Sequence, residues 1–251
     1  MSDFLILFIA GLIGGVMNAV AGGGTFITFP ALVFAGIPPV AANATATVAA
    51  LPGYLAAAIS FRREVLTVPR AQLIRLTIWT VVGSAIGSGL LLVSSNAAFS
   101  ALVPFLLLAA TVIFLKDGAI RTFAARHARE VVPFGIATLL PVAIYGGYFN
   151  GGLGIVLLAL FALWGMTDLN QMNGLKSWLS FALSLISFAI FAIGGMVVWG
   201  PAAVMAVGTI AGGLLGAPVS RRIPMAGLRA LIAAIGFGMT IIFFLRLYNG
   251  G

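Results

Sequence analysis

The strongest constraint on the fold is a pair of apolar runs that are each too long for one straight membrane helix. Residues 4–34 and 131–164 are uncharged, and as single helices they would span roughly 46 Å or more, against a hydrocarbon core of about 30 Å. Glycine clusters interrupt both runs. Because irregular backbone survives in a bilayer only where protein or a hydrated cavity covers it, the runs predict two broken helices that face each other.

The rest of the chain agrees with a helical membrane protein. Of its 251 residues, 62% are hydrophobic and 7% are charged, whereas about a quarter of the residues of a soluble domain are charged. The apolar runs are too long for barrel strands and do not alternate, so we expect helices. The chain has no cysteine, which excludes disulfides and thiolate chemistry. We therefore predict an all-α polytopic protein in the lipid bilayer.

The second half of the chain repeats the pattern of the first half. Each half opens with one broken run and continues with three further apolar segments. We predict a first repeat at residues 1–116, a basic connector at 117–130 and a second repeat at 131–251, which together form one membrane domain. The six further apolar segments are 41–61, 73–93, 101–115, 175–193, 202–216 and 225–245.

The basic residues predict the topology of these segments. The net charge of +8 comes mainly from arginines in short loops beside apolar segments, which is typical of cytoplasmic loops and does not indicate nucleic-acid binding. If both broken runs leave on the side they enter, the basic loops at 62–75, 116–130 and 221–222 share one side. Each half then crosses three times, which inverts the second repeat. We expect a bacterial inner membrane protein with cytoplasmic basic loops and both termini in the periplasm.

The two breaks carry the residue types of an anion-binding site. Free N–H groups and the positive end of a half-helix dipole bind anions without a charged side chain. Asparagines precede both breaks and recur after the turn that follows each of them. The alternative is that these amides cap helices or bond between helices to stabilise a kink. The predicted substrate-binding residues are Asn18, Gly22, Gly23, Gly24, Thr25, Asn43, Thr45, Tyr148, Asn150, Gly151, Gly152, Asn173 and Lys176.

Lys176 is the most informative single residue. It lies inside an apolar segment, where a charge costs about 3 kcal/mol or more unless it is paired or hydrated. The apolar segments contain no acidic residue to pair with it, so a bound anion is the predicted partner. Two alternatives remain: the side chain extends to the nearby membrane surface, or it pairs with Asp168.

Enzyme signatures are absent from the sequence. It contains no HExxH motif, no nucleotide-binding phosphate loop and no paired carboxylates within the apolar segments, so we predict no catalytic residues, no metal site and no cofactor. The expected partners are a small anionic substrate and the lipid bilayer, without nucleic acid. The sequence leaves a homodimer open.

Several motifs occur along nearly the whole length of the chain. They are NAVAGGGT at 18–25, Phe29-Pro30, GIP at 36–38, ANAT at 42–45, GG at 146–147, GGLG at 151–154, NGLK at 173–176 and the stretch 208–222. Together they resemble the sulfite exporter TauE/SafE family. The resemblance implies a protein that moves sulfite, sulfonates or related organosulfur anions across the bacterial inner membrane, usually outward.

The sequence and this resemblance together predict a secondary transporter that exports a small sulfur-containing anion by alternating access. An inside-negative potential of 100 mV favours the exit of an anion by about 2.3 kcal/mol per charge. Two other functions remain open: a passive anion channel built on the same site, and a non-transporting membrane subunit that binds a partner.

Overall fold

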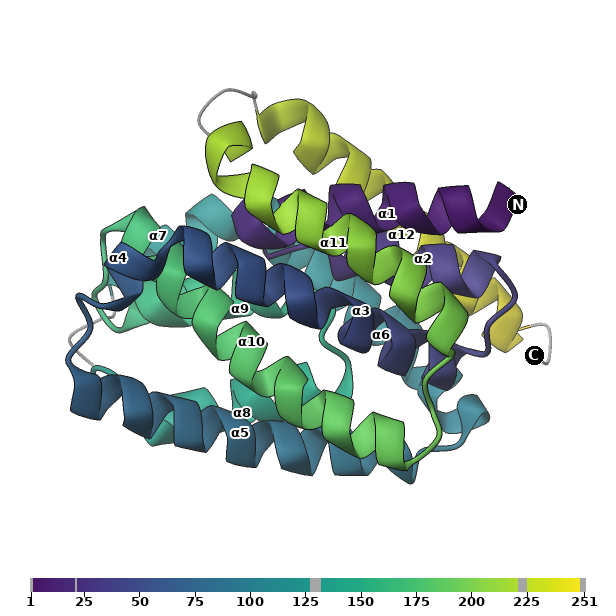
Figure 1. Ribbon diagram of the computed structural model, residues 1–251, viewed down its shortest axis with the longest axis horizontal. Coiled ribbons are helices and arrows are strands. Elements are labelled where there is room, and N and C mark those ends of the chain that lie inside the picture. Colours follow the sequence, from purple (N-terminus) through teal and green to yellow (C-terminus); the bar gives the residue numbers. More distant parts are fainter. Residues whose placement is uncertain (1, 21, 127–131, 221–224, 249–251) are drawn as a thin grey trace.

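The computed structural model describes residues 2–20, 22–126, 132–220 and 225–248. Every regular element in these ranges is an α-helix (Figure 1), which confirms the all-α, polytopic prediction. Four of the described helices are long and apolar enough to cross a membrane. These are α3 (Pro39–Ser60), α5 (Arg70–Leu92), α6 (Asn96–Leu115) and α10 (Leu169–Ile193).

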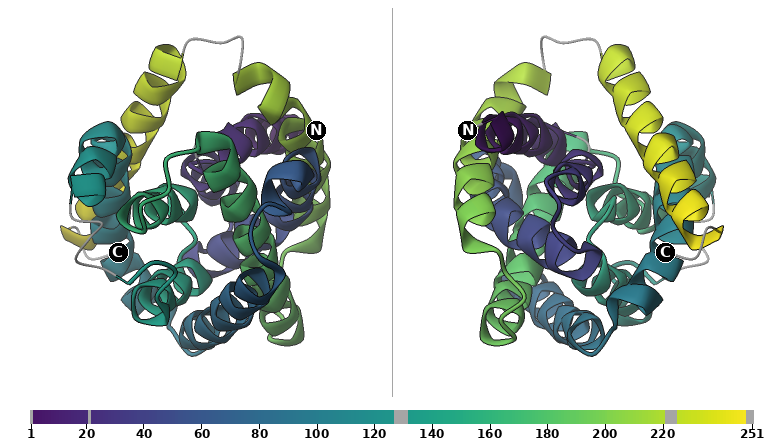
Figure 2. Two further views of the ribbon diagram at one scale, coloured as in Figure 1. Left: turned by 90° about the vertical axis from the view of Figure 1, so that its left-hand side faces the viewer. Right: turned by 90° about the vertical axis from the view of Figure 1, so that its right-hand side faces the viewer.

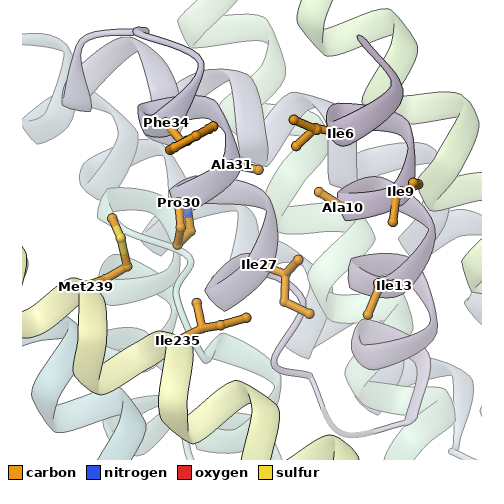
Figure 3. A pocket seen from close by; sticks show the side chains of 10 residues that line it. All are labelled: Ile6, Ile9, Ala10, Ile13, Ile27, Pro30, Ala31, Phe34, Ile235 and Met239. Atoms are coloured by element: carbon orange, nitrogen blue, oxygen red, sulfur yellow. The ribbon is translucent and has the colours of Figure 1, made fainter. Parts of the chain in front are cut away.

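The first apolar run is divided into two antiparallel helices. Helix α1 (Ser2–Val20) ends at the glycine cluster, and α2 (Thr25–Phe34) runs back beside it. Figure 3 shows this reversal, because Ile6 at the start of α1 lies level with the end of α2, whereas Ile13 lies level with Ile27. The two helices and α12 (Met225–Tyr248) border an apolar groove of about 420 Å³. The first run therefore folds back on itself at its glycine cluster.

The second run is divided in the same way. Helix α8 (Ile136–Tyr148) ends before the second glycine cluster, and α9 (Leu153–Leu163) begins after it. The turn between them uses left-handed backbone at Asn150 (φ 58°) and Gly152 (φ 71°), which is rare for residues other than glycine and asparagine. Asp168 then starts α10 by accepting hydrogen bonds from the amides of Asn170 (2.8 Å) and Gln171 (3.3 Å), as an N-cap residue does.

Corresponding helices of the two halves exchange corresponding contacts. Helix α1 packs along α11 (Trp199–Ser220), and α8 packs along α5. Helix α3 contacts both α10 and α11, and α10 also contacts α5. Helix α12, drawn in yellow, lies beside α6 on the outside of the bundle (Figure 2). The first helix of each half is therefore held mainly by the other half.

Glycines allow these helices to approach closely. A β-carbon built at Gly212 lies 2.1 Å from the carbonyl oxygen of Leu12 across the α1–α11 contact. At the equivalent α5–α8 contact, a β-carbon built at Gly87 lies 2.1 Å from the carbonyl oxygen of Ile144. Small residues at such contacts let backbones pack directly, which drives helix association in lipid.

We expect Gly212→Ala to destabilise the protein by about 1–3 kcal/mol, because the added methyl group meets backbone that cannot rotate away. Gly89→Ala is the matched control, since no atom lies within 4 Å of its built β-carbon. That change should leave stability unchanged or raise it by up to about 1 kcal/mol. Thermal unfolding of the detergent-solubilised variants measures both effects, and equal melting temperatures would refute direct packing at Gly212.

Basic stretches gather at one end of the molecule. Helix α4 (Arg62–Val65), the start of α5 and α7 (Asp117–Arg126) lie on the left in Figure 1, whereas the start of α1 and the end of α12 lie on the right. Residues 221 and 222, the third predicted basic loop, lie outside the described residues. The connector predicted at 117–130 contains a helix that the sequence analysis did not anticipate, and this helix packs against α9.

Candidate functional site

The two broken runs meet at their breaks. A β-carbon built at Gly22 lies 2.3 Å from the Cα of Gly154, so the two backbones are in contact. The hydroxyl of Thr25 donates a hydrogen bond to the carbonyl oxygen of Asn150 (3.3 Å). We call residues 22–25 and 150–154 the crossing. It brings the N-terminal ends of α2 and α9 together inside the protein.

The first break is held by its own side chains. Gly22 adopts left-handed backbone (φ 79°), and its amide donates to the carbonyl oxygen of Met17 (2.8 Å). The Oδ1 of Asn18 accepts a hydrogen bond from the amide of Gly24 (2.8 Å). Asn18 therefore bonds across the break, from α1 to Gly24 at the N-cap position of α2.

We expect Asn18→Ala to lower stability by about 1 kcal/mol, because the buried Gly24 amide loses its acceptor. Asn18→Asp keeps an acceptor at this position, and the N-terminus of α2 favours its negative charge, so this variant should lose less stability than Asn18→Ala. Its negative charge should nevertheless weaken the binding of any anion at the crossing. Melting temperatures with and without anion separate the two effects, and equal anion affinity in Asn18→Asp and the wild type would contradict an anion near Asn18.

The second break is held by side chains from both halves of the chain. The Nδ2 of Asn150 donates to the hydroxyl oxygen of Thr47 (3.5 Å), and its Oδ1 accepts from the Tyr54 hydroxyl (3.5 Å). Both partners belong to α3. On the other side, the Tyr145 hydroxyl donates to the carbonyl oxygen of Gly151. The turn is therefore fixed by both halves.

Asn43 also reaches the second break. Its Nδ2 donates to the carbonyl oxygen of Tyr148 (2.9 Å), at the end of α8. Its Oδ1 is buried and has no hydrogen-bond partner among the described residues. The Tyr148 hydroxyl instead approaches the Ser94 hydroxyl (3.4 Å), beside a groove of about 680 Å³ between α5, α6 and α8.

Lys176 lies beside the crossing and is 1% exposed. Its Nζ donates to the Oδ1 of Asn173 (2.8 Å) and to the carbonyl oxygen of Ala19 (3.1 Å), at the end of α1. A β-carbon built at Gly154 lies 3.1 Å from its Cδ. The side chain therefore does not extend to the surface, and Asp168 serves as the cap of α10. The Ala19 carbonyl oxygen and the Asn173 Oδ1 are both neutral acceptors.

The structure gathers most of the predicted residues but not all of them. Both glycine clusters, Thr25, Asn150 and Lys176 lie at or beside the crossing, and Asn18, Asn43 and Asn173 bond to the residues around it. Thr45 lies elsewhere, since its hydroxyl oxygen accepts from the amide of Val198 (3.0 Å), just before α11.

The predicted set left out Thr47, Tyr54 and Tyr145, which hold the second break. A signal for two of them exists in the sequence. Positions 43, 47 and 54 fall on one face of a helix with 3.6 residues per turn, so Asn43 and its two neighbours share a surface. Tyr145 carries no comparable signal beyond its place before the break.

Sequence comparison supplies the family. The sequence model of the family described as Sulfite exporter TauE/SafE matches residues 7–243. The chain belongs to this family. A "Probable membrane transporter protein" of Haemophilus influenzae is similar to the chain. It is 32% identical over 240 residues, which cover 94% of this chain and 92% of the relative.

Two further relatives are similar over most of their length. "Probable membrane transporter protein ORF9" of a Sinorhizobium species is 30% identical over 223 residues, covering 88% of this chain and 82% of the relative. "Probable membrane transporter protein YfcA" of Escherichia coli is 27% identical over 212 residues, covering 84% and 78%. No solved structure matches the chain. This TauE/SafE protein is thus a multi-pass member of a membrane transporter family.

Proposed function

We propose that this TauE/SafE protein is a secondary transporter that exports a small sulfur-containing anion, such as sulfite or a sulfonate, by alternating access. The observation that carries the proposal is the position of Lys176, whose buried ammonium group lies beside the meeting point of two half-helix N-termini. The family description supports sulfite as the first candidate substrate.

The crossing has the electrostatics of an anion site. Helices α2 and α9 each begin there, and each contributes the partial positive charge of its N-terminus, roughly half an elementary charge. Gly23 is the most open of the glycines at the crossing, because a β-carbon built there meets no atom closer than 3.5 Å, so an oxyanion oxygen could approach the backbone closely at this position. Lys176 adds a full positive charge within the same buried region. An anion there would gain from all three sources in a medium that screens charge poorly.

The packing of the two halves supports alternating access. Helix α1 of the first half packs on α11 of the second half, and α8 of the second half packs on α5 of the first half. Residues 22–25 and 150–154 of the crossing come from different halves, so rocking of the halves would move these two segments relative to each other. We propose that the halves are inverted repeats, as in many secondary transporters. The basic helices at one end of the molecule would then face the cytoplasm of the bacterial inner membrane, with both termini in the periplasm.

Purified protein in liposomes tests the proposal. Vesicles loaded with sulfite should lose it only when they contain the protein, and an inside-negative potential should accelerate efflux. External unlabelled anion should drive counterflow of labelled anion, as a carrier allows and a simple channel does not. The absence of protein-dependent flux of sulfite and of simple sulfonates would refute the proposal, and flux at channel rates without counterflow would replace it with the channel alternative.

A further inference from the structure

The buried oxygen of Asn43 is an acceptor that the described protein does not use. Asn43 is 1% exposed, and its Nδ2 is fixed by the carbonyl oxygen of Tyr148. A carboxamide rotated by half a turn would place the Asn43 Oδ1 against the Tyr148 carbonyl oxygen, and two acceptors would then face each other. The bond from Nδ2 therefore fixes the direction in which Oδ1 points. That Oδ1 has no partner among the described residues. A buried acceptor left unpaired is costly, and a ligand that donates to it recovers the cost.

Asn173, the counterpart of Asn43 in the second half, shows what such an oxygen binds. Asn43 is the fifth residue of α3, which starts at Pro39, and Asn173 is the fifth residue of α10, which starts at Leu169. The Oδ1 of Asn173 accepts a hydrogen bond from the ammonium group of Lys176, three residues further on.

The first half has no such donor at the matching position. Three residues after Asn43 stands Ala46, which has no polar side-chain atom. The two asparagines therefore occupy equivalent places, but only Asn173 has its oxygen bonded to a donor from its own helix. An equivalent donor for Asn43 has to come from outside the described protein.

We infer that the Oδ1 of Asn43 accepts a hydrogen bond from the transported anion, and that the preferred substrate carries a donor on its organic part. This inference rests on the proposed function. The anionic group of the substrate would lie at the crossing, and its donor would bond to the Oδ1 of Asn43. Asn43 is close to the crossing because its Nδ2 bonds to the carbonyl oxygen of Tyr148, two residues before Asn150. A hydroxyl group or an ammonium group supplies the required chemistry, so hydroxy- and aminosulfonates fit better than plain alkanesulfonates.

Three sulfonates with the same two-carbon skeleton test this inference. Ethanesulfonate has no donor, 2-hydroxyethanesulfonate has a hydroxyl group, and 2-aminoethanesulfonate, a zwitterion without net charge, has an ammonium group. We expect purified wild-type protein to bind at least one of the two donor-bearing sulfonates tenfold or more tightly than ethanesulfonate in calorimetric titrations. A site built to bond a substrate donor rejects the analogue that lacks it, because its own polar group is then left unpaired.

Asn43→Leu should remove this preference. Because the variant also loses the bond to the Tyr148 carbonyl oxygen, the readout is the ratio of its affinities for the three sulfonates and not its affinity for ethanesulfonate alone. Thr111→Val is the matched control, because Thr111 Oγ1 is also buried without a partner but lies against Gly236 of α12. That variant should keep the preference. Equal wild-type affinities for the three sulfonates would overturn the inference and leave the proposed function intact, as would a preference that persists in Asn43→Leu. If the variant does not fold, the wild-type comparison decides. Failure of every sulfonate and of sulfite to bind would refute both.

Discussion

Replacing Lys176 with methionine is expected to weaken anion binding more than tenfold. A charge-assisted hydrogen bond contributes about 1.5–3 kcal/mol, and each 1.4 kcal/mol corresponds to a factor of ten in affinity. The methionine side chain is unbranched like that of lysine, so it can fill the space beside Gly154 without placing a charge there. The melting temperature of the variant without anion should change little, because the lost bonds to Ala19 and Asn173 are offset by the removal of a buried charge.

Lys116→Met is the matched control for this experiment. Lys116 is exposed at the end of α6, so its loss removes the same net charge far from any buried partner. We expect its sulfite-dependent rise in melting temperature to equal that of the wild type, since a ligand stabilises the state that it binds. If Lys176→Met and Lys116→Met retain equal anion-dependent stabilisation, Lys176 does not contribute to the site.

Gly154→Ala is expected to separate the two arms of the crossing. A β-carbon at this position lies 2.4 Å from the Cα of Gly22. Because the contact is with backbone, no side-chain rotation relieves it, and the backbone itself must move. We expect a loss of about 1–3 kcal/mol of stability. Transport should fall further than stability does, because both half-helix N-termini shift relative to the bound anion and such sites depend on ångström-scale placement.

Gly200→Ala provides the comparison for Gly154→Ala. Gly200 lies in the first turn of α11, and no atom lies within 4 Å of its built β-carbon. Flux in liposomes and melting temperature in detergent should both match the wild type. A Gly154→Ala variant with normal flux would show that contact between the breaks is not required for transport.

Sequence reasoning located the breaks because two local quantities determine them. Apolar runs longer than a membrane span must turn back or tilt, and the glycine clusters mark where the backbone can do so. Both helix pairs divide at those clusters, at Val20 and Thr25 in the first run and at Tyr148 and Leu153 in the second. The sequence also placed Lys176 inside an apolar segment but left open whether its side chain extends to the membrane surface, and the structure shows the side chain buried.

The partners of individual polar groups were less predictable from sequence. Thr45 and Thr47 are two residues apart on α3, yet their hydroxyls face different parts of the molecule, Val198 for one and Asn150 for the other. Helix rotation about its axis decides this, and tertiary packing sets that rotation. The bond from Lys176 to the Ala19 carbonyl likewise joins residues 157 positions apart, so no local pattern indicates it.

The helix at 117–126 shows a second limit of sequence reasoning. Its charged and polar residues suggested a connector between two repeats. Its sequence also contains alanines and arginines, which favour helix, and α9 provides a surface against which it packs. Local preference was therefore present in the sequence, but the packing partner that stabilises the helix was not visible there.

Protection of a cysteine at position 23 by anions would show directly whether an anion binds at the crossing. The natural chain has no cysteine, so a Gly23→Cys variant carries a single thiol. A β-carbon built at Gly23 meets no atom closer than 3.5 Å, and the substitution should therefore fold. Gly200→Cys supplies a control thiol remote from the crossing.

Both variants are treated in liposomes with a small neutral methanethiosulfonate, with and without a saturating concentration of a sulfonate that binds. If an anion binds at the crossing, the sulfonate should slow modification of the Gly23→Cys thiol severalfold and leave modification of the Gly200→Cys thiol unchanged. Equal rates of Gly23→Cys modification with and without bound anion, or a thiol at position 23 that never reacts, would contradict an anion site at the crossing.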